Sequence, residues 1–128
     1  MQKLEVGQIG EVAALTTTKG QEPFVFKGEL MAWSSKRTDG RLGDTSPIAI
    51  LRLYKNVSGR VKPSRRFIIA FEKIEADGSL ITASYRSYTG LQKMAEKSPV
   101  DKMHRRICEL VGVREYMSDM KPTEVGGQ

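Results

Sequence analysis

The sequence has few of the residues from which metal centres and covalent active sites are built. It holds one histidine, His104, and one cysteine, Cys108. A zinc site needs three or four ligands, so these two residues cannot form one by themselves. A single cysteine also excludes an intramolecular disulfide, which fits a reducing compartment. The sequence therefore predicts no metal site and a cytoplasmic location.

Long apolar runs and nucleotide-binding motifs are also absent from the sequence. No stretch approaches the ~20 apolar residues that a membrane helix needs, and the opening residues, MQKLEVGQIGEV, lack the apolar centre of a signal peptide. The glycine-rich motifs of P-loop and dinucleotide-binding proteins do not occur. We therefore expect no membrane partner and no cofactor, and we assign no catalytic residue.

The length and composition fit one globular domain. The chain has 128 residues, of which 39% are hydrophobic and 28% charged, enough for one core without disulfides or metals. No repeat, low-complexity stretch or Pro/Gly/Ser-rich linker divides it. We predict a single domain over residues 1–120 and a flexible tail, KPTEVGGQ, over residues 121–128.

The first 88 residues show the two-residue periodicity of strands separated by turn residues. In the second predicted strand, strict alternation places Leu30 and Ala32 on one face, with Met31 and Trp33 on the other. The Asp-Gly pair at 77–78 is a strong hairpin signal. Strands are predicted over residues 7–17, 24–34, 47–54, 66–74 and 79–88.

The apolar spacing becomes helical after residue 88. Residues 89–97 predict a two-turn helix. Ser98 and Pro99 predict the N-cap and the first position of a second helix, and Gly112 predicts its end. Residues 113–120 fit a further short helix.

Sequential strands with short connections favour an antiparallel meander. Residues 66–74 are apolar on both faces, so both faces of the sheet must be covered, one by helices and the other by curling or by a second copy. We predict an α+β fold, in which a curved antiparallel sheet of about five strands, a meander or a barrel-like variant of it, is followed by C-terminal helices packed on one face. An OB-like barrel is the alternative. It usually carries a helix between its third and fourth strands, where this sequence has a basic loop.

Positive charge is concentrated in one quarter of the chain. The net charge is +6, and residues 34–66 alone carry +7. The segment 52–66, RLYKNVSGRVKPSRR, holds six cations and no acid, and Gly59 and Pro63 predict a loop within it. Such a loop can follow a phosphate backbone, and arginine can bind phosphate through two hydrogen bonds. We therefore expect a polyanionic partner.

Aromatic residues accompany these charges, and Trp33 and Tyr54 are the best candidates for stacking on unpaired bases. The loop after the second strand adds further cations. In a meander the two basic loops lie at opposite ends of the third strand, so they form one patch only if the sheet curves or the loops fold over it. The predicted nucleic-acid-binding residues are Trp33, Lys36, Arg37, Arg41, Arg52, Tyr54, Lys55, Arg60, Lys62, Arg65 and Arg66.

Three functions are compatible with this pattern. The leading interpretation is a non-enzymatic nucleic-acid-binding protein, with single-stranded DNA or RNA slightly favoured. The alternative is a protein-interaction module, an inhibitor or regulatory subunit, whose basic loop binds an acidic protein. The third is a metal-independent ribonuclease that uses His104 with cationic side chains. A homo-oligomer is compatible with each of them.

Overall fold

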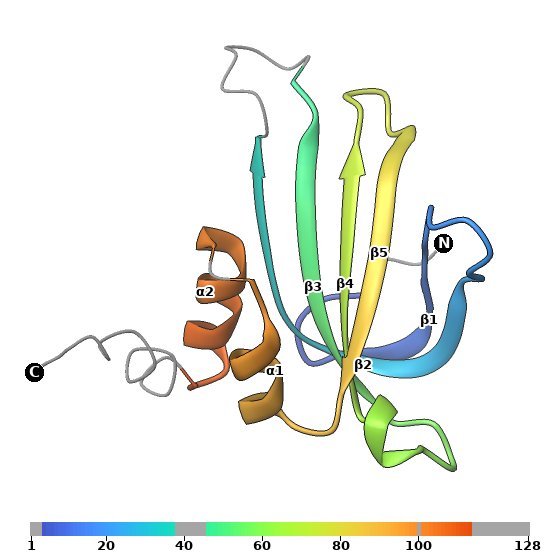
Figure 1. Cartoon of the computed structure of the whole chain (residues 1–128), viewed down its shortest axis with the longest axis vertical. Coiled ribbons are helices and arrows are strands. Elements are labelled where there is room, and N and C mark those ends of the chain that lie inside the picture. Colours follow the sequence, from blue (N-terminus) through green and yellow to red (C-terminus); the bar gives the residue numbers. More distant parts are fainter. Residues whose placement is uncertain (1–3, 38–45, 100, 114–128) are drawn as a thin grey trace, which may run out of the picture.

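The computed structural model describes residues 4–37, 46–99 and 101–113. Five strands pair in sequence order, each antiparallel to its neighbour, and two helices follow (Figure 1). The fold is therefore α+β, with the curved antiparallel meander and C-terminal helices that the sequence predicts. The elements are β1 (Ile9–Ala14), β2 (Phe24–Arg37), β3 (Ile48–Asn56), a 3₁₀ helix (Pro63–Arg65), β4 (Phe67–Ile74), β5 (Leu80–Tyr88), α1 (Leu91–Lys97) and α2 (Lys102–Leu110).

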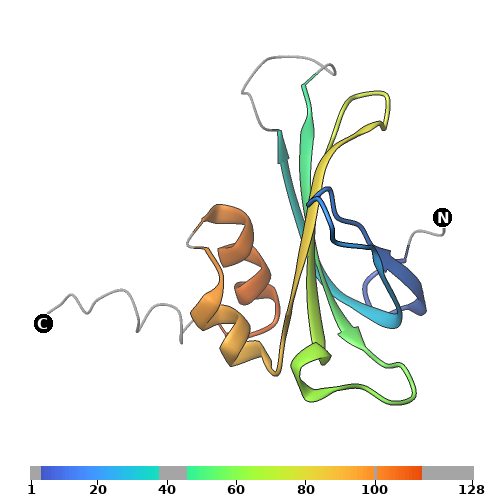
Figure 2. The ribbon, with the colours of Figure 1, turned by 45° about the vertical axis from the view of Figure 1, so that its right-hand side comes forward.

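The sheet curls so that each of its faces has its own cover. Figures 1 and 2 show both helices on one side and, on the other, β1 with the first half of β2 arching across the sheet. We call these the helix side and the arch side. None of the helices in the described residues has the length and apolar composition needed to cross a bilayer.

Two buried clusters lie on these two sides, and neighbouring residues of the central strands alternate between them. On β3, Leu53 is buried beneath the helices and Tyr54 beneath the arch. On β4, Ile69 is buried beneath the helices and Ile68 beneath the arch. This confirms the expectation that the fourth strand is covered on both faces. The helix-side cluster is Ala32, Ala49, Leu51, Leu53, Ile69, Tyr88, Met94, Ala95, Met103, Ile107 and Cys108. The arch-side cluster is Val12, Ala14, Phe26, Leu30, Tyr54, Ile68 and Ala70.

A β-bulge at Met31 makes β2 change face. Leu30 pairs with Tyr54 and Ala32 with Leu53, so Met31 is an extra residue in the ladder. Leu30 is buried on the arch side and Ala32 on the helix side. The prediction that both share a face is therefore wrong, because strict alternation does not anticipate an inserted residue.

The turn between β1 and β2 closes the arch against β5. The Thr17 backbone N–H donates to the Ala83 carbonyl oxygen at 2.9 Å, and the Ala83 N–H donates to Thr17 Oγ1 at 3.1 Å. The Tyr85 hydroxyl donates to the Glu22 carbonyl oxygen at 3.1 Å. These bonds connect the β1–β2 turn to β5, the last strand of the meander. They hold the sheet in its curled, barrel-like shape.

The start of α2 differs from its prediction. Ser98 ends α1, and its hydroxyl donates to the Met94 carbonyl oxygen. Asp101 is the N-cap of α2, and its carboxylate accepts from the His104 backbone N–H at 2.8 Å. The reason is that a residue before proline is disfavoured in helical conformation, so the chain is extended at Ser98 and α1 ends there.

The end of α2 agrees with its prediction. Gly112 has a positive φ of 83°, and the Val113 N–H donates back to the Cys108 carbonyl oxygen at 2.9 Å. This is the Schellman arrangement that glycine favours. The predicted helix over 113–120 and the predicted tail over 121–128 lie outside the described residues, apart from residue 113.

Helix-side packing can be tested with two residues of α2. Ile107 is fully buried, whereas Leu110, one turn later, is 48% exposed. We expect Ile107→Ala to lower the free energy of unfolding by about 2–5 kcal/mol, and Leu110→Ala to change it by about 0.5 kcal/mol or less. Urea denaturation measures both values. Equal losses would show that α2 does not dock on the sheet through Ile107.

Candidate nucleic-acid interface

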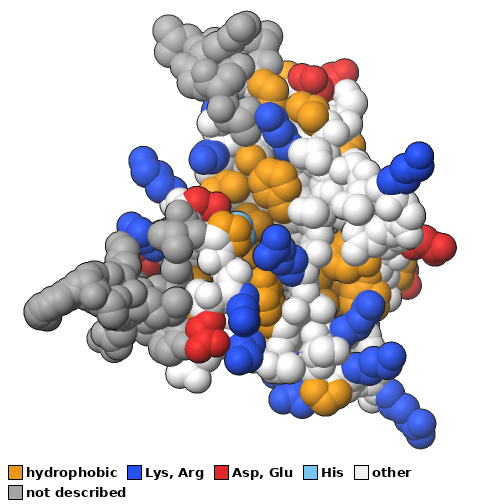
Figure 3. All heavy atoms as spheres, in the orientation of Figure 1, with side chains coloured by type: hydrophobic (Ala, Val, Ile, Leu, Met, Phe, Trp, Pro, Cys, Tyr) orange, Lys and Arg blue, Asp and Glu red, His pale blue; other side chains and the backbone are white. Residues whose placement is uncertain are grey.

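The connection between β3 and β4 is an exposed basic loop, residues 57–66. Arg60, Lys62, Arg65 and Arg66 all project into solvent from it. Among the described residues, no carboxylate forms an ion pair with any of these four side chains. Figure 3 shows Lys and Arg side chains gathered at the lower right, where this loop lies in Figure 1. The loop therefore presents positive charge that is not neutralised by any carboxylate the structure describes.

The basic loop is held by hydrogen bonds at its base. The buried Asn56 side chain donates to the Arg65 carbonyl oxygen at 3.0 Å, and its backbone N–H donates to the Arg66 carbonyl oxygen at 2.9 Å. The Ser58 hydroxyl accepts from the Lys27 backbone N–H at 3.0 Å. These bonds fix the loop backbone to β2 and β3. A loop held in this way loses less conformational entropy on binding a partner than a flexible loop would lose.

Aromatic rings lie directly beneath the basic loop. The Arg65 guanidinium carbon lies 4.3 Å from the centroid of the Phe24 ring. Phe24 stacks on Phe26 with centroids 5.1 Å apart and on Tyr85 at 6.1 Å. A pocket of about 350 Å³ opens here, the Phe24 pocket, lined by Phe24, Val25, Phe26, Asn56, Ser58, Arg60, Val61, Lys62 and Arg65.

The structure brings together only part of the predicted site. Arg60, Lys62 and Arg65 share the Phe24 pocket, and Arg66 belongs to the same loop. The exposed Lys55 lies one residue before the end of β3.

The other predicted cations lie elsewhere. Lys36 and Arg37 are at the far end of β2, where the Arg37 guanidinium donates to the Ser46 carbonyl oxygen at 3.2 Å. Arg41 lies outside the described residues. Arg52 faces the arch side in the middle of β3. Lys36, Arg37 and Arg52 therefore do not form one continuous patch with the basic loop.

The two predicted stacking residues have different environments. Tyr54 is only 8% exposed and meets Phe26 edge-on with centroids 5.7 Å apart. Its burial raises the pKa of the Tyr54 phenol, and its ring presents no free face to a base. Trp33 is 50% exposed, so its indole can stack on a ligand.

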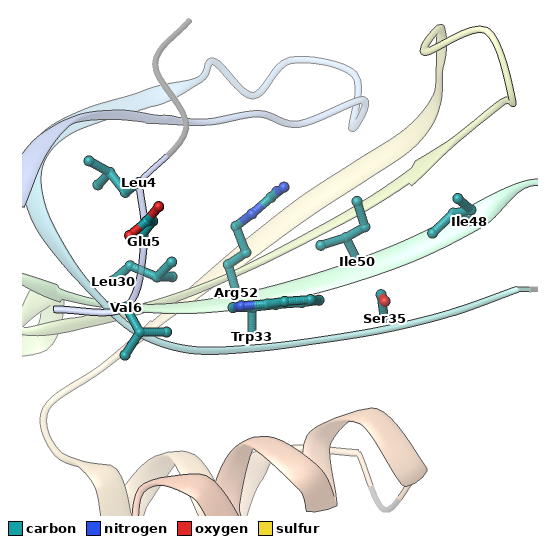
Figure 4. A pocket seen from close by; sticks show the side chains of 9 residues that line it. All are labelled: Leu4, Glu5, Val6, Leu30, Trp33, Ser35, Ile48, Ile50 and Arg52. Atoms are coloured by element: carbon teal, nitrogen blue, oxygen red, sulfur yellow. The ribbon is translucent and has the colours of Figure 1, made fainter. Parts of the chain in front are cut away.

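A second hollow, the sheet cleft, lies on the arch side beyond the arch. Its volume is about 430 Å³. On its floor an Arg52 guanidinium nitrogen lies 3.4 Å from Glu72 Oε1. The lining residues are Leu4, Glu5, Val6, Leu30, Trp33, Ser35, Ile48, Ile50 and Arg52 (Figure 4).

Sequence reasoning missed Phe24 and Phe26 as neighbours of the basic loop. Alternation does place Phe24 and Phe26 on one face of a strand. Their approach to residues 57–66 depends on the curl of β2 and on the closure at Thr17, which no local pattern encodes.

His104 has a structural role on α2. Its ring Nδ1 lies 2.9 Å from Asp101 Oδ1, and its side chain is largely buried. The neighbouring Cys108 is buried, and burial raises the pKa of its thiol. Figures 1 and 2 place α2 on the side of the molecule away from the basic loop. No set of three His, Cys, Asp or Glu side chains suitable for a metal ion occurs in the part of the chain that the structure describes.

Comparison of the chain with protein-family models, with curated proteins and with solved structures finds no match. The interpretation of its site therefore depends on its own residues.

The Asp101 cap makes a testable contribution to stability. Partial burial tends to raise the pKa of its carboxyl, but hydrogen bonds from the His104 backbone and ring, with the charges of His104 and Lys36, lower it overall. A lowered folded-state pKa stabilises the fold above the unfolded value of about 3.9, and this contribution disappears as the pH falls through the folded value.

We expect Asp101→Ala to lower the free energy of unfolding by about 1 kcal/mol at neutral pH. The deficit should shrink as the pH falls below about 3.9. Asp101→Asn, which keeps a capping oxygen, should lose less. Urea titrations over this pH range measure the effect, and a deficit that does not change with pH would contradict the assignment.

Proposed function

We propose that this protein is a non-enzymatic binder of single-stranded nucleic acid that uses the basic loop and the Phe24 pocket. The observation that supports the proposal best is the Arg65 guanidinium above the Phe24 ring, with Arg60 and Lys62 lining the same pocket. Unpaired bases stack on aromatic rings and on arginine planes, while cations beside them contact phosphates. The loop offers both kinds of contact within one pocket.

Arg65 is the proposed base contact. Its guanidinium carbon lies 4.3 Å from the centroid of the Phe24 ring, which supports the group from one side, and the side chain is exposed. A base can stack on the outer face of the guanidinium without opening the aromatic cluster beneath. Because stacking needs an unpaired base, the proposal favours single strands of DNA or RNA over a duplex.

Arg60, Lys62 and Arg66 are the proposed phosphate contacts. Each phosphate neutralised on a single strand contributes about −0.7 to the slope of log affinity against log salt concentration. If Arg65 also reaches a phosphate, four contacts correspond to a slope of about −2.8, or about 50-fold weaker binding for a fourfold rise in salt.

The single cysteine, Cys108, which is buried and unpaired, fits a reducing cytoplasm in which nucleic acid is accessible.

The proposal predicts a selective effect of neutralising the loop. The loop variant replaces Arg60, Lys62, Arg65 and Arg66 with Gln. The matched control replaces four exposed helix cations with Gln, Lys93, Lys97, Lys102 and Arg106, and so removes the same charge. In fluorescence anisotropy with labelled strands of about 30 nucleotides, we expect the loop variant to bind about tenfold more weakly or worse. The control should stay within about threefold.

Three outcomes decide this experiment. Wild-type binding that weakens with salt and depends on the loop supports the proposal, and comparison of single-stranded DNA, RNA and duplex identifies the preferred strand. Equal losses in both variants would mean that net charge alone is responsible. No binding at low salt would refute the proposal and direct attention to an acidic protein partner for the same loop.

A further inference from the structure

The sheet cleft is separate from the basic loop and shares no residue with the Phe24 pocket. It lies where β2 and β3 extend beyond the arch. Figure 4 shows Ile48, Ile50 and Arg52 projecting from β3 on the side away from the helices, with Trp33 and Ser35 beside them on β2. At about 430 Å³ it falls within the range of small-ligand sites, roughly 300–1,000 Å³.

The walls of the cleft suit a ligand with a flat apolar face, such as an aromatic ring. Trp33 pairs with Arg52 across the β2–β3 ladder, and its half-exposed indole borders the cleft. Ile48 and Ile50 continue the floor along β3, and Leu30 and Leu4 close one end. An aromatic ring entering the cleft could stack on the indole and displace water from the isoleucines.

The polar groups of the cleft suit a ligand whose ring edge carries both hydrogen-bond donors and acceptors. Arg52 carries five N–H donors, and Glu72 holds its guanidinium at 3.4 Å with both side chains 23% exposed. Ser35 can donate or accept, and the Glu5 carboxylate can accept. Among the described residues that line the cleft, Arg52 is the only cation and is already paired, and Glu5 carries the opposite charge. This arrangement does not favour a phosphate.

We infer that the sheet cleft binds a nucleobase. A nucleobase has apolar faces, which match Trp33 and the isoleucines, and an edge of donors and acceptors, which matches Arg52, Ser35 and Glu5. The base can come from a free nucleoside or from an unpaired position of a strand. This inference goes beyond the proposed function, because a nucleoside can occupy the cleft whether or not the basic loop binds phosphates.

Trp33 is the only tryptophan of the chain, so its fluorescence reports directly on the cleft. We expect nucleosides, and short oligonucleotides if a strand reaches the cleft, to quench this fluorescence in a saturable manner, and ribose to have no effect. The one indole N–H signal in an NMR spectrum should shift with the same dissociation constant. Both measurements use the unmodified protein and do not depend on whether a variant folds.

Two conservative variants locate the binding. Arg52→Lys keeps the charge but loses the planar set of donors, and we expect the dissociation constant of the nucleoside to rise about tenfold. The matched control, Arg86→Lys, changes an exposed arginine of β5 that pairs with Ile69, a residue of the helix-side cluster. It should leave the dissociation constant unchanged.

The outcomes separate this inference from the proposed function. Loop-dependent strand binding without any change at Trp33 would leave the proposed function standing and overturn the cleft assignment. Quenching by nucleosides that persists in the loop variant, with no strand binding by the wild type, would support the cleft and refute the loop. Equal effects of Arg52→Lys and Arg86→Lys, or no response to nucleoside or oligonucleotide, would overturn the inference.

Discussion

The bulge at Met31 is the local feature on which much of the architecture depends. Up to Leu30 the inward side chains of β2 pack on the arch side; from Ala32 onward the opposite set packs beneath the helices. One strand of 14 residues therefore serves two layers, pairing with β1 through its first half and with β3 through its second. If β2 alternated strictly through Met31, with no bulge, Trp33 would face the helices instead of the sheet cleft.

Gly28 is the second local requirement of the arch. It pairs with Gly10 on β1 and with Asn56 on β3, at the point where β2 passes from one partner to the other. A Cβ atom at Gly28 would lie 2.6 Å from the Phe26 ring, so the ring occupies the space that a side chain would need. The aromatic group under Arg65 follows from this close packing, because Phe26 supports Phe24.

The two hollows of the molecule have different chemistry because they lie at different parts of the same curl. The Phe24 pocket is bordered by three cations of a loop that carries no acid, and so it suits a phosphate with a stacked base. In the part of the chain that the structure describes, the sheet cleft has one cation, already paired with Glu72, and mostly apolar walls. We therefore propose that the Phe24 pocket recognises phosphate charge and that the sheet cleft recognises the edge of a ring.

Sequence alone determined the features that depend on local periodicity: five strands, two helices, the glycine that ends α2 and a basic loop without acids. These follow from neighbouring residues and their backbone preferences. The tertiary structure alone decided the bulge at Met31, the burial of Tyr54, the exposure of Trp33 and the placing of Phe24 beneath Arg65. Each of these depends on contacts between strands distant in the chain, and such contacts are set by how the whole sheet curls.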